Sequence, residues 1–366
     1  MGLELADIFN QYGPAYRQKY ADQLLPSHRQ AMHAIEQCRT EALGGQVYTC
    51  PACGEMQYSY HSCRNRHCPK CQNDKAQEWL QAQQGLLLPV PYFMLTFTLP
   101  ATLCEIVRSH QTLFYNLLFR ISGAATQHLA KDPHFIGGQI GLVGILHTWG
   151  RNLAYHPHLH YLVPAGGLAI DTQTWLPARQ DFLLPVKALS KIFRGKFRQA
   201  LKKTALFTQI PAKVWQQDWV VHCKPVGNGR TALKYLAPYV FRVAISNRRL
   251  VKLENDQVTF RYRATDTGQL KLCTLSAEEF IHRFLQHVLP KGFVKVRYFG
   301  FFAPGCRKRL TAVRQQLELT HPSNLDDIEA PQAPADFASE PKLCCPNCGQ
   351  PLLFQRTIQP TGRCPP

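Results

Sequence analysis

The feature that most constrains this chain is a segment with six cysteines between residues 38 and 71. The segment is short and is interrupted by glycines and prolines, so it cannot bury a core large enough to fold unaided. Two Cys-x-x-Cys pairs, Cys50 with Cys53 and Cys68 with Cys71, have the spacing at which two thiolates bind one tetrahedral zinc ion. We therefore predict that these pairs form a zinc ribbon, since structural zinc supplies on the order of 10 kcal/mol of folding free energy.

Donors left over in the same segment predict a second zinc ion, so one or two Zn²⁺ ions are expected. These donors are Cys38, Cys63 and His67. Basic side chains stand among the predicted ligands, where they could hold phosphates. They are Arg64, Arg66 and Lys70. The alternative interpretation is that some of the thiols are ordinary buried cysteines.

The last part of the chain repeats the cysteine pattern once. From about residue 320 the sequence is acidic and rich in proline, which is typical of a linker, and Cys345 and Cys348 then form one Cys-x-x-Cys pair. The tail lacks a second pair, although Cys344 and Cys364 could complete a site. The alternative is a frayed tail with free thiols.

The net charge indicates a polyanionic partner. The chain has 42 Lys and Arg against 24 Asp and Glu, a formal charge of +18, which favours nucleic acid or an anionic membrane surface. The N-terminus has no basic start followed by an apolar run, and the most apolar stretch, residues 86–100, is shorter than the roughly 20 residues of a membrane span. We therefore expect no export and no membrane partner. In a reducing compartment, clustered thiols favour metal over disulfides.

Hydrophobic periodicity predicts a mixed fold. Helices are expected over residues 1–37, 101–131, 186–207, 229–245 and 276–289. Strands are expected over residues 92–98, 141–149, 156–163, 258–263 and 270–275. Because hairpins are interspersed with helices, the pattern favours an α+β fold with an antiparallel sheet. The expected division is 1–84 for the helical and zinc-binding part, 85–318 for the main domain and 319–366 for the linker and tail.

Three histidines at alternate positions of a predicted strand carry the most chemical information. His156, His158 and His160 would face the same side, and burying three imidazoles without a partner would be costly. We predict that His158 and His160 bind a divalent metal ion. A hairpin would bring His147 alongside them as third ligand, with His156 as its rival. One alternative is a row of polar side chains whose hydrogen bonds are satisfied within the protein. Another is the three-histidine motif of the histidine-triad nucleotide hydrolases, which needs no metal.

A pair of tyrosines helps to separate these alternatives. Tyr235 and Tyr239 are four residues apart, so on a helix both hydroxyl groups leave the same face, although Pro238 costs that helix a hydrogen bond unless it lies in the first turn. Four basic residues lie nearby and are expected to contact the phosphates of nucleic acid: Lys234, Arg242, Arg248 and Arg249. A tyrosinate that attacks a metal-polarised phosphodiester leaves a 5′-phosphotyrosine and a free 3′-hydroxyl. The alternative is that both tyrosines are core aromatics.

Taken together, these motifs resemble the rolling-circle transposases of the insertion-sequence-ninety-one family, over about residues 10 to 310. The motifs are Cys63-Arg-Asn-Arg-His67-Cys68-Pro-Lys-Cys71, Leu146-His147-Thr-Trp-Gly150, His156-Pro-His158-Leu-His160 and the stretch from Tyr235 to Asn247. Two positions depart from the family pattern. His61 stands where a polar amide is expected, so it is not counted as a ligand, and Pro238 replaces a basic residue of some members.

The resemblance implies an HUH-type nuclease fold, with helices over a central antiparallel sheet, preceded by a zinc-binding module. It implies that His158 and His160 bind the catalytic ion, Mg²⁺ or Mn²⁺, and that Tyr235 and Tyr239 are the nucleophiles. The expected partner is single-stranded DNA at element ends and target sites, and the expected location is the bacterial cytoplasm, at the nucleoid. The expected function is a transposase that nicks and rejoins this DNA.

The alternative function is a catalytically inactive zinc-ribbon DNA-binding protein derived from such a transposase. It predicts DNA binding that is unaffected by Tyr235→Phe or His158→Ala, without nicking. A histidine-triad enzyme explains neither the cysteines nor the charge of +18.

Overall fold

The computed structural model describes residues 2–71, 79, 82, 83, 85–229, 231, 233, 240, 244–264, 267–320 and 343–361. Its longer helices are α1 (Leu5–Lys19), α2 (Pro26–Glu36), α4 (Cys104–Ser109), α5 (Gln111–Ala130), α6 (Val186–Leu201), α8 (Ala277–Leu285) and α9 (Arg307–Thr320). The first strands are β1 (Gly45–Thr49), β2 (Met56–Tyr60), β3 (Pro91–Thr98), β4 (Leu142–Trp149), β5 (Tyr155–Pro164), β6 (Gly166–Leu168) and β7 (Trp175–Pro177). The others are β8 (Val221–Asn228), β9 (Leu250–Glu254), β10 (Gln257–Arg263), β11 (Leu270–Ser276), β12 (Val296–Phe299) and β13 (Leu353–Ile358).

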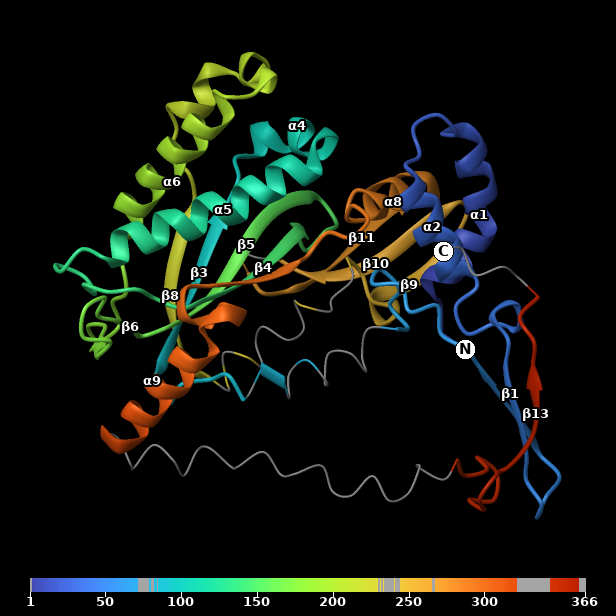
Figure 1. Ribbon diagram of the computed structural model, residues 1–366. Coiled ribbons are helices and arrows are strands. Elements are labelled where there is room, and N and C mark those ends of the chain that lie inside the picture. Colours follow the sequence, from blue (N-terminus) through green and yellow to red (C-terminus); the bar gives the residue numbers. More distant parts are fainter. Residues whose placement is uncertain are drawn as a thin grey trace.

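A five-stranded sheet forms the centre of the molecule. Its strand order is β12-β4-β5-β3-β8, and each neighbouring pair is antiparallel. With helices packed around it, this sheet confirms the predicted α+β fold (Figure 1). Most of the helix expected over residues 229–245, the linker after residue 320 and Cys364 lie outside the described residues.

The two faces of the sheet have different coverings. On one face Leu159 and Tyr161 of β5 share a core with α5 and α6, where the Phe97 ring lies 5.0 Å from that of Phe193. On the other face Ile145 and Leu162 pack with residues of α9. Because side chains alternate along a strand, the histidines of β4 and β5 belong to this second face.

A second core holds the tip of the β4–β5 hairpin. Leu153, at this tip, is fully buried among residues of α1, α2, α8 and β10. His287, just beyond α8, makes hydrogen bonds of 3.2 Å to the Thr148 hydroxyl and to the Leu153 carbonyl oxygen. The hairpin that carries the histidines is therefore attached at its tip to the surrounding helices.

The tail joins the N-terminal cysteine segment through strand pairing. A three-stranded sheet has the order β13-β1-β2, with Gly45 of β1 opposite both Ile358 of β13 and Tyr60 of β2. This ribbon extends away from the main sheet (Figure 1). The pairing couples the tail, expected as a separate part, to the module near the N-terminus.

Among the described residues, no helix is both long enough and apolar enough to cross a membrane. This finding agrees with the interpretation of residues 86–100, which include β3 of the sheet.

Replacing Leu159 by alanine tests the packing of the histidine strand. Leu159 is 0% exposed and lies between His158 and His160. Its side chain is in the core that the sheet shares with α5 and α6. We expect Leu159→Ala to lower the free energy of unfolding by about 2–5 kcal/mol, measured by urea denaturation. Leu272→Ala, at a position 63% exposed on β11, is the control and should change it little. Equal losses in both variants would contradict this packing.

Candidate functional site

Strand pairing brings three histidines together. In the β4–β5 register His147 lies opposite His158, and Ile145 lies opposite His160. The ring centroid of His147 is 5.3 Å from that of His158 and 4.9 Å from that of His160. One ring nitrogen from each of the three lies within 4.8 Å of the others. This spacing is short enough for one metal ion to contact all three rings.

Hydrogen bonds orient two of these rings. Nδ1 of His158 lies 2.6 Å from the His156 carbonyl oxygen, which can only accept, so Nδ1 carries the proton and Nε2 keeps its lone pair. Nδ1 of His160 lies 3.1 Å from the Thr96 hydroxyl of β3. Metal-binding histidines commonly use one ring nitrogen in this way to fix the other toward the ion. The rings are thus arranged to present Nε2.

The position of His156 separates the two candidates for third ligand. His156 is exposed, and it supplies its backbone carbonyl to His158. The ring nitrogens that lie together belong to His147, His158 and His160. The geometry therefore favours His147 as the third ligand.

Burial keeps the imidazoles of His158 and His160 uncharged. Burial lowers the pKa of His158 to about 4 and that of His160 to about 3. Neutral imidazole is the form that binds a metal ion. Beside them, the Trp149 ring stacks on His147 at 5.1 Å and 22°, and the Lys295 ammonium lies 5.0 Å from the Trp149 ring. Three imidazole nitrogens would leave the other coordination positions of a divalent ion open to water and phosphate oxygens.

The predicted nucleophiles lie outside the described residues. These are Tyr235 and Tyr239, and the basic residues Lys234 and Arg242 lie outside them as well. Leu233 and Val240, which flank the tyrosines in the sequence, are described. Both are buried in the same cluster as Ile145 and Leu162, on the sheet face that carries the histidines.

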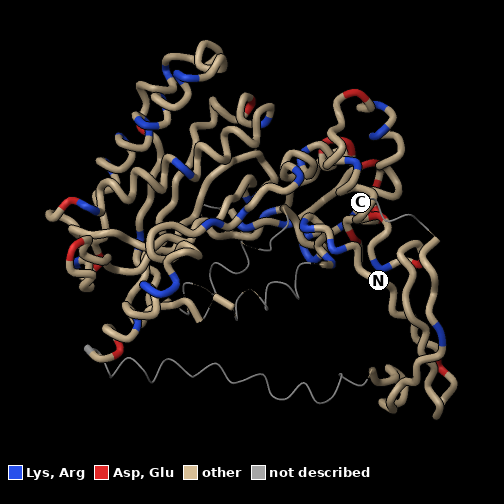
Figure 2. Tube along the Cα trace, viewed as in Figure 1, with Lys and Arg blue, Asp and Glu red and all other residues tan. Residues whose placement is uncertain are grey.

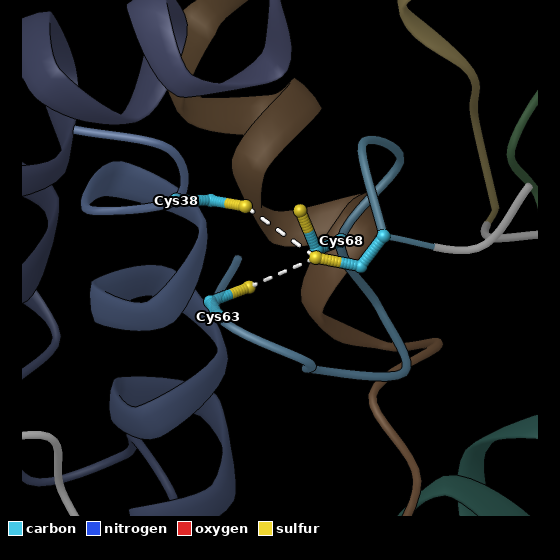
Figure 3. Close-up of side chains that lie close together, drawn as sticks. Cys38, Cys63 and Cys68 are labelled. Carbon is cyan, nitrogen blue, oxygen red and sulfur yellow. Dashed lines mark hydrogen bonds between the residues drawn. The ribbon is translucent and has the colours of Figure 1, made fainter. Parts of the chain in front are cut away.

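Four cysteines of the N-terminal segment form a first thiol cluster. Cys38, Cys63, Cys68 and Cys71 each place a sulfur within 4.8 Å of the others. The Cys38 and Cys63 sulfurs lie 3.4 and 3.6 Å from that of Cys71. With Zn–S bonds of about 2.3 Å, sulfurs of a tetrahedral zinc site lie about 3.8 Å apart, so these residues fit zinc. Figure 3 shows three of these side chains pointing toward one another.

The structure corrects the predicted pairing of the Cys-x-x-Cys motifs. Cys68 and Cys71 join Cys38 and Cys63, whereas Cys50 and Cys53 lie with Cys345 and Cys348 of the tail, in what we call the second thiol cluster. The physical reason is the β1–β2 hairpin, whose open end brings the segments before β1 and after β2 together. Its turn, which carries Cys50 and Cys53, lies five residues, or about 17 Å of strand, away from that open end.

The prediction that His67 binds zinc is also wrong, because among the described residues His67 belongs to neither thiol cluster. Its Nε2 accepts a hydrogen bond of 3.3 Å from the Leu289 backbone N–H. Burial lowers the pKa of His67 to about 3, so the ring is neutral. Its role in the structure is to join the cysteine segment to the residues after α8.

Comparison with known proteins identifies the family. The model of the transposase zinc-binding domain matches residues 8–99, and the model described as “Putative transposase” matches residues 141–310. “Putative transposase y4qJ” of Sinorhizobium fredii is 40% identical over 374 residues, covering 95% of this chain and 94% of that protein. The chain belongs to the insertion-sequence-ninety-one family of transposases. The transposase for insertion sequence element IS801 of Pseudomonas savastanoi pv. phaseolicola is 29% identical over 385 residues, covering 95% and 92% of the two chains. No solved structure matches this chain significantly.

The matches agree with the sequence-based resemblance and define its extent. The zinc-binding model of this transposase family includes the first thiol cluster, and the second model includes His147, His158 and His160. Zinc is therefore a cofactor, and DNA is the partner. Neither family model reaches Cys345 or Cys348.

The residues that were predicted to contact DNA, and that the structure describes, fall into two groups. Arg64 and Arg248 are exposed and accessible to DNA. Three others make contacts within the protein: Arg66, although exposed, donates to the Phe293 carbonyl oxygen at 2.7 Å, Lys70 forms an ion pair with Glu4, and Arg249 donates to the Arg261 carbonyl oxygen at 2.9 Å. Arg249 also donates to the Arg151 carbonyl oxygen. Its guanidinium thus fastens the β4–β5 hairpin tip to β10.

Two functional features escaped sequence reasoning. The partnership of Cys50 and Cys53 with the tail had one signal, because both pairs occur in the string Cys-Pro-x-Cys-Gly. The contact of Thr96 with His160 had none, since it depends on the register between β3 and β5, in which these residues lie opposite each other.

Replacing Thr96 tests the orientation of His160. We expect Thr96→Val to weaken binding of Mn²⁺ about tenfold or more, because the ring loses the hydroxyl that holds it. Thr96→Ser keeps the hydroxyl and should retain the affinity. Isothermal titration calorimetry with Mn²⁺ measures both variants, and a Thr96→Val protein with unchanged affinity would contradict this role.

Proposed function

We propose that this transposase cleaves and rejoins single-stranded DNA through a 5′-phosphotyrosine intermediate, in rolling-circle-type transposition. The observation that carries the proposal is the meeting of His147, His158 and His160 on one sheet face. The residues that flank Tyr235 and Tyr239 in the sequence are buried in that same face. A metal-ligand set and two nucleophiles would thus share one site.

Each part of this site has a separate task. A hard divalent cation, Mg²⁺ or Mn²⁺, bound by ring nitrogens of His147, His158 and His160 would polarise the scissile phosphate. The His156 carbonyl and the Thr96 hydroxyl hold two of these rings in place, so little reorganisation is needed when the DNA binds.

The chemical step exchanges one ester for another. The phenolate oxygen of one tyrosine attacks the phosphorus, a P–O bond to tyrosine forms, and the bond from phosphorus to the 3′ oxygen breaks. The 3′ oxygen leaves and takes up a proton as a free hydroxyl group. Because the phosphotyrosine retains the energy of the diester, a free 3′-hydroxyl can attack it to rejoin strands without a further energy source. The second tyrosine allows another cleavage before the first is resealed.

The charge distribution supports a strand of DNA as substrate. Lys and Arg outnumber Asp and Glu around β9 and β10, next to the tip of the hairpin that carries the histidines (Figure 2). Of the seven residues predicted to contact DNA, Arg64 and Arg248 are exposed and keep this role in the proposal, whereas Lys234 and Arg242 lie outside the described residues. Phosphate contacts with a single strand make binding weaken with salt, at a slope of roughly −0.7 per contact.

A double tyrosine variant tests the nucleophiles. The transposase is incubated with labelled single-stranded element ends and Mg²⁺ or Mn²⁺, and covalent adducts are counted on a denaturing gel. We expect an adduct with the unmodified protein and with the control Tyr262→Phe, and none with Tyr235→Phe/Tyr239→Phe. An adduct that survives in the double variant would exclude both tyrosines as nucleophiles. DNA binding without any adduct in the unmodified protein would instead favour an inactive DNA-binding relative.

Two neighbouring arginines provide a matched pair for DNA contact. Arg248→Ala should reduce the salt slope of single-strand binding by about 0.7 and leave stability unchanged, because the side chain is exposed. Arg249→Ala should lower the free energy of unfolding by about 1–3 kcal/mol, because it leaves backbone carbonyls without their donor. Fluorescence anisotropy over a salt series and urea denaturation measure the two effects. A loss of stability in Arg248→Ala, with a changed salt slope only in Arg249→Ala, would overturn these roles.

A further inference from the structure

We propose that the second thiol cluster binds a zinc ion of its own and that this ion fastens the C-terminal tail to the N-terminal module. Cys50 and Cys53 come from the β1–β2 turn, and Cys345 and Cys348 come from the turn that precedes β13. The result is a zinc ribbon whose two halves are separated in the sequence by the whole DNA-processing domain.

The sulfur positions fit one tetrahedral ion. The Cys50 sulfur lies 3.4 Å from that of Cys348, and the Cys53 sulfur lies 3.6 Å from that of Cys345 and 3.7 Å from that of Cys348. These separations approach the roughly 3.8 Å edge of a tetrahedron with Zn–S bonds of about 2.3 Å. They are far longer than a disulfide bond of about 2.05 Å, so the four sulfurs are arranged as thiolate ligands.

The two turns have the same backbone structure. In the first, the Gly54 N–H donates to the Cys50 carbonyl oxygen at 2.9 Å, and the Cys50 N–H donates to the Glu55 carbonyl oxygen at 2.8 Å. In the second, the equivalent bonds run from Gly349 to Cys345 at 2.9 Å and from Cys345 to Gln350 at 2.8 Å.

The glycines that close these turns match as well. Gly54 and Gly349 both have φ of 74°, a left-handed conformation that favours glycine. Two turns that share the string Cys-Pro-x-Cys-Gly and this geometry, and that face each other through their thiols, form the two halves of one four-cysteine site. Cys344, the neighbour of Cys345, is not part of it.

The strand order also places the tail against the N-terminal module, and it does so independently of the thiols. β13 pairs along β1 from Gly45↔Ile358 to Thr49↔Leu353, so the tail lies beside the strand that leads into the first turn. Most of β13 is exposed, and Leu353 and Phe354 are 59% and 57% exposed. A strand that buries so little apolar surface has a weak hydrophobic hold on its neighbour. The zinc ion supplies the missing stability.

Counting zinc tests the site directly. The full chain should contain two zinc ions by inductively coupled plasma mass spectrometry, and Cys345→Ser/Cys348→Ser should contain one. The matched control Cys223→Ser/Cys306→Ser changes two cysteines outside both clusters and should keep two. One zinc in the unmodified chain, or two in the tail variant, would overturn the proposal. Zinc content does not depend on DNA cleavage, so this result is separate from that of the nicking assay.

A cleaved chain tests the fastening itself and does not require the tail variant to fold. A protease site is inserted after residue 331, and the cut protein is analysed by native gel filtration. The tail fragment should stay with the body while zinc is bound, and a chelator should release it. Cys50→Ser/Cys53→Ser should release it without chelator. A fragment that leaves the zinc-loaded body, or that stays with the Cys50→Ser/Cys53→Ser body, would overturn the proposal.

Discussion

The register between β4 and β5 is the constraint on which the proposed active site depends. It places His147 opposite His158. A slip of one residue would turn His158 and His160 into the core beneath α5 and α6. The structure fixes this register at the hairpin tip, where Leu153 is buried and His287 bonds to both Thr148 and the Leu153 carbonyl oxygen. Residues distant in the sequence thus secure the alignment of the histidines.

Local patterns were sufficient to predict three of the five strands of the sheet, β3, β4 and β5, and the grouping of its histidines, whereas the edge strands β8 and β12 were not predicted. Alternation at His156, His158 and His160 predicts one shared face, and the preceding strand with its short turn brings His147 alongside. The sequence could not show which of His147 and His156 completes the group, because that depends on strand register. Thr96 was unpredictable for the same reason, since its contact with His160 joins strands more than sixty residues apart.

The cysteine and arginine assignments show where sequence spacing misleads. Two Cys-x-x-Cys pairs 14 residues apart suggest one ribbon, but the β1–β2 hairpin separates them and gives each pair a different partner. Among neighbouring arginines, Arg248 is exposed whereas Arg249 donates to backbone carbonyl groups. Composition counts both as charges available to DNA. Only the folded chain distinguishes a charge that faces the solvent from one that holds two segments together.

The two thiol clusters lie at opposite ends of the β1–β2 hairpin, and this placement gives them different relations to the histidines. Cys38, Cys68 and Cys71 of the first cluster belong to the same core as Leu153, so zinc there stabilises the packing that holds the histidine hairpin. The second cluster lies at the far turn, where β2 and β13 bury little surface. Zinc at that end therefore acts on the ribbon itself. One short hairpin can thus contribute both to the support of the histidine strand and to the attachment of the tail.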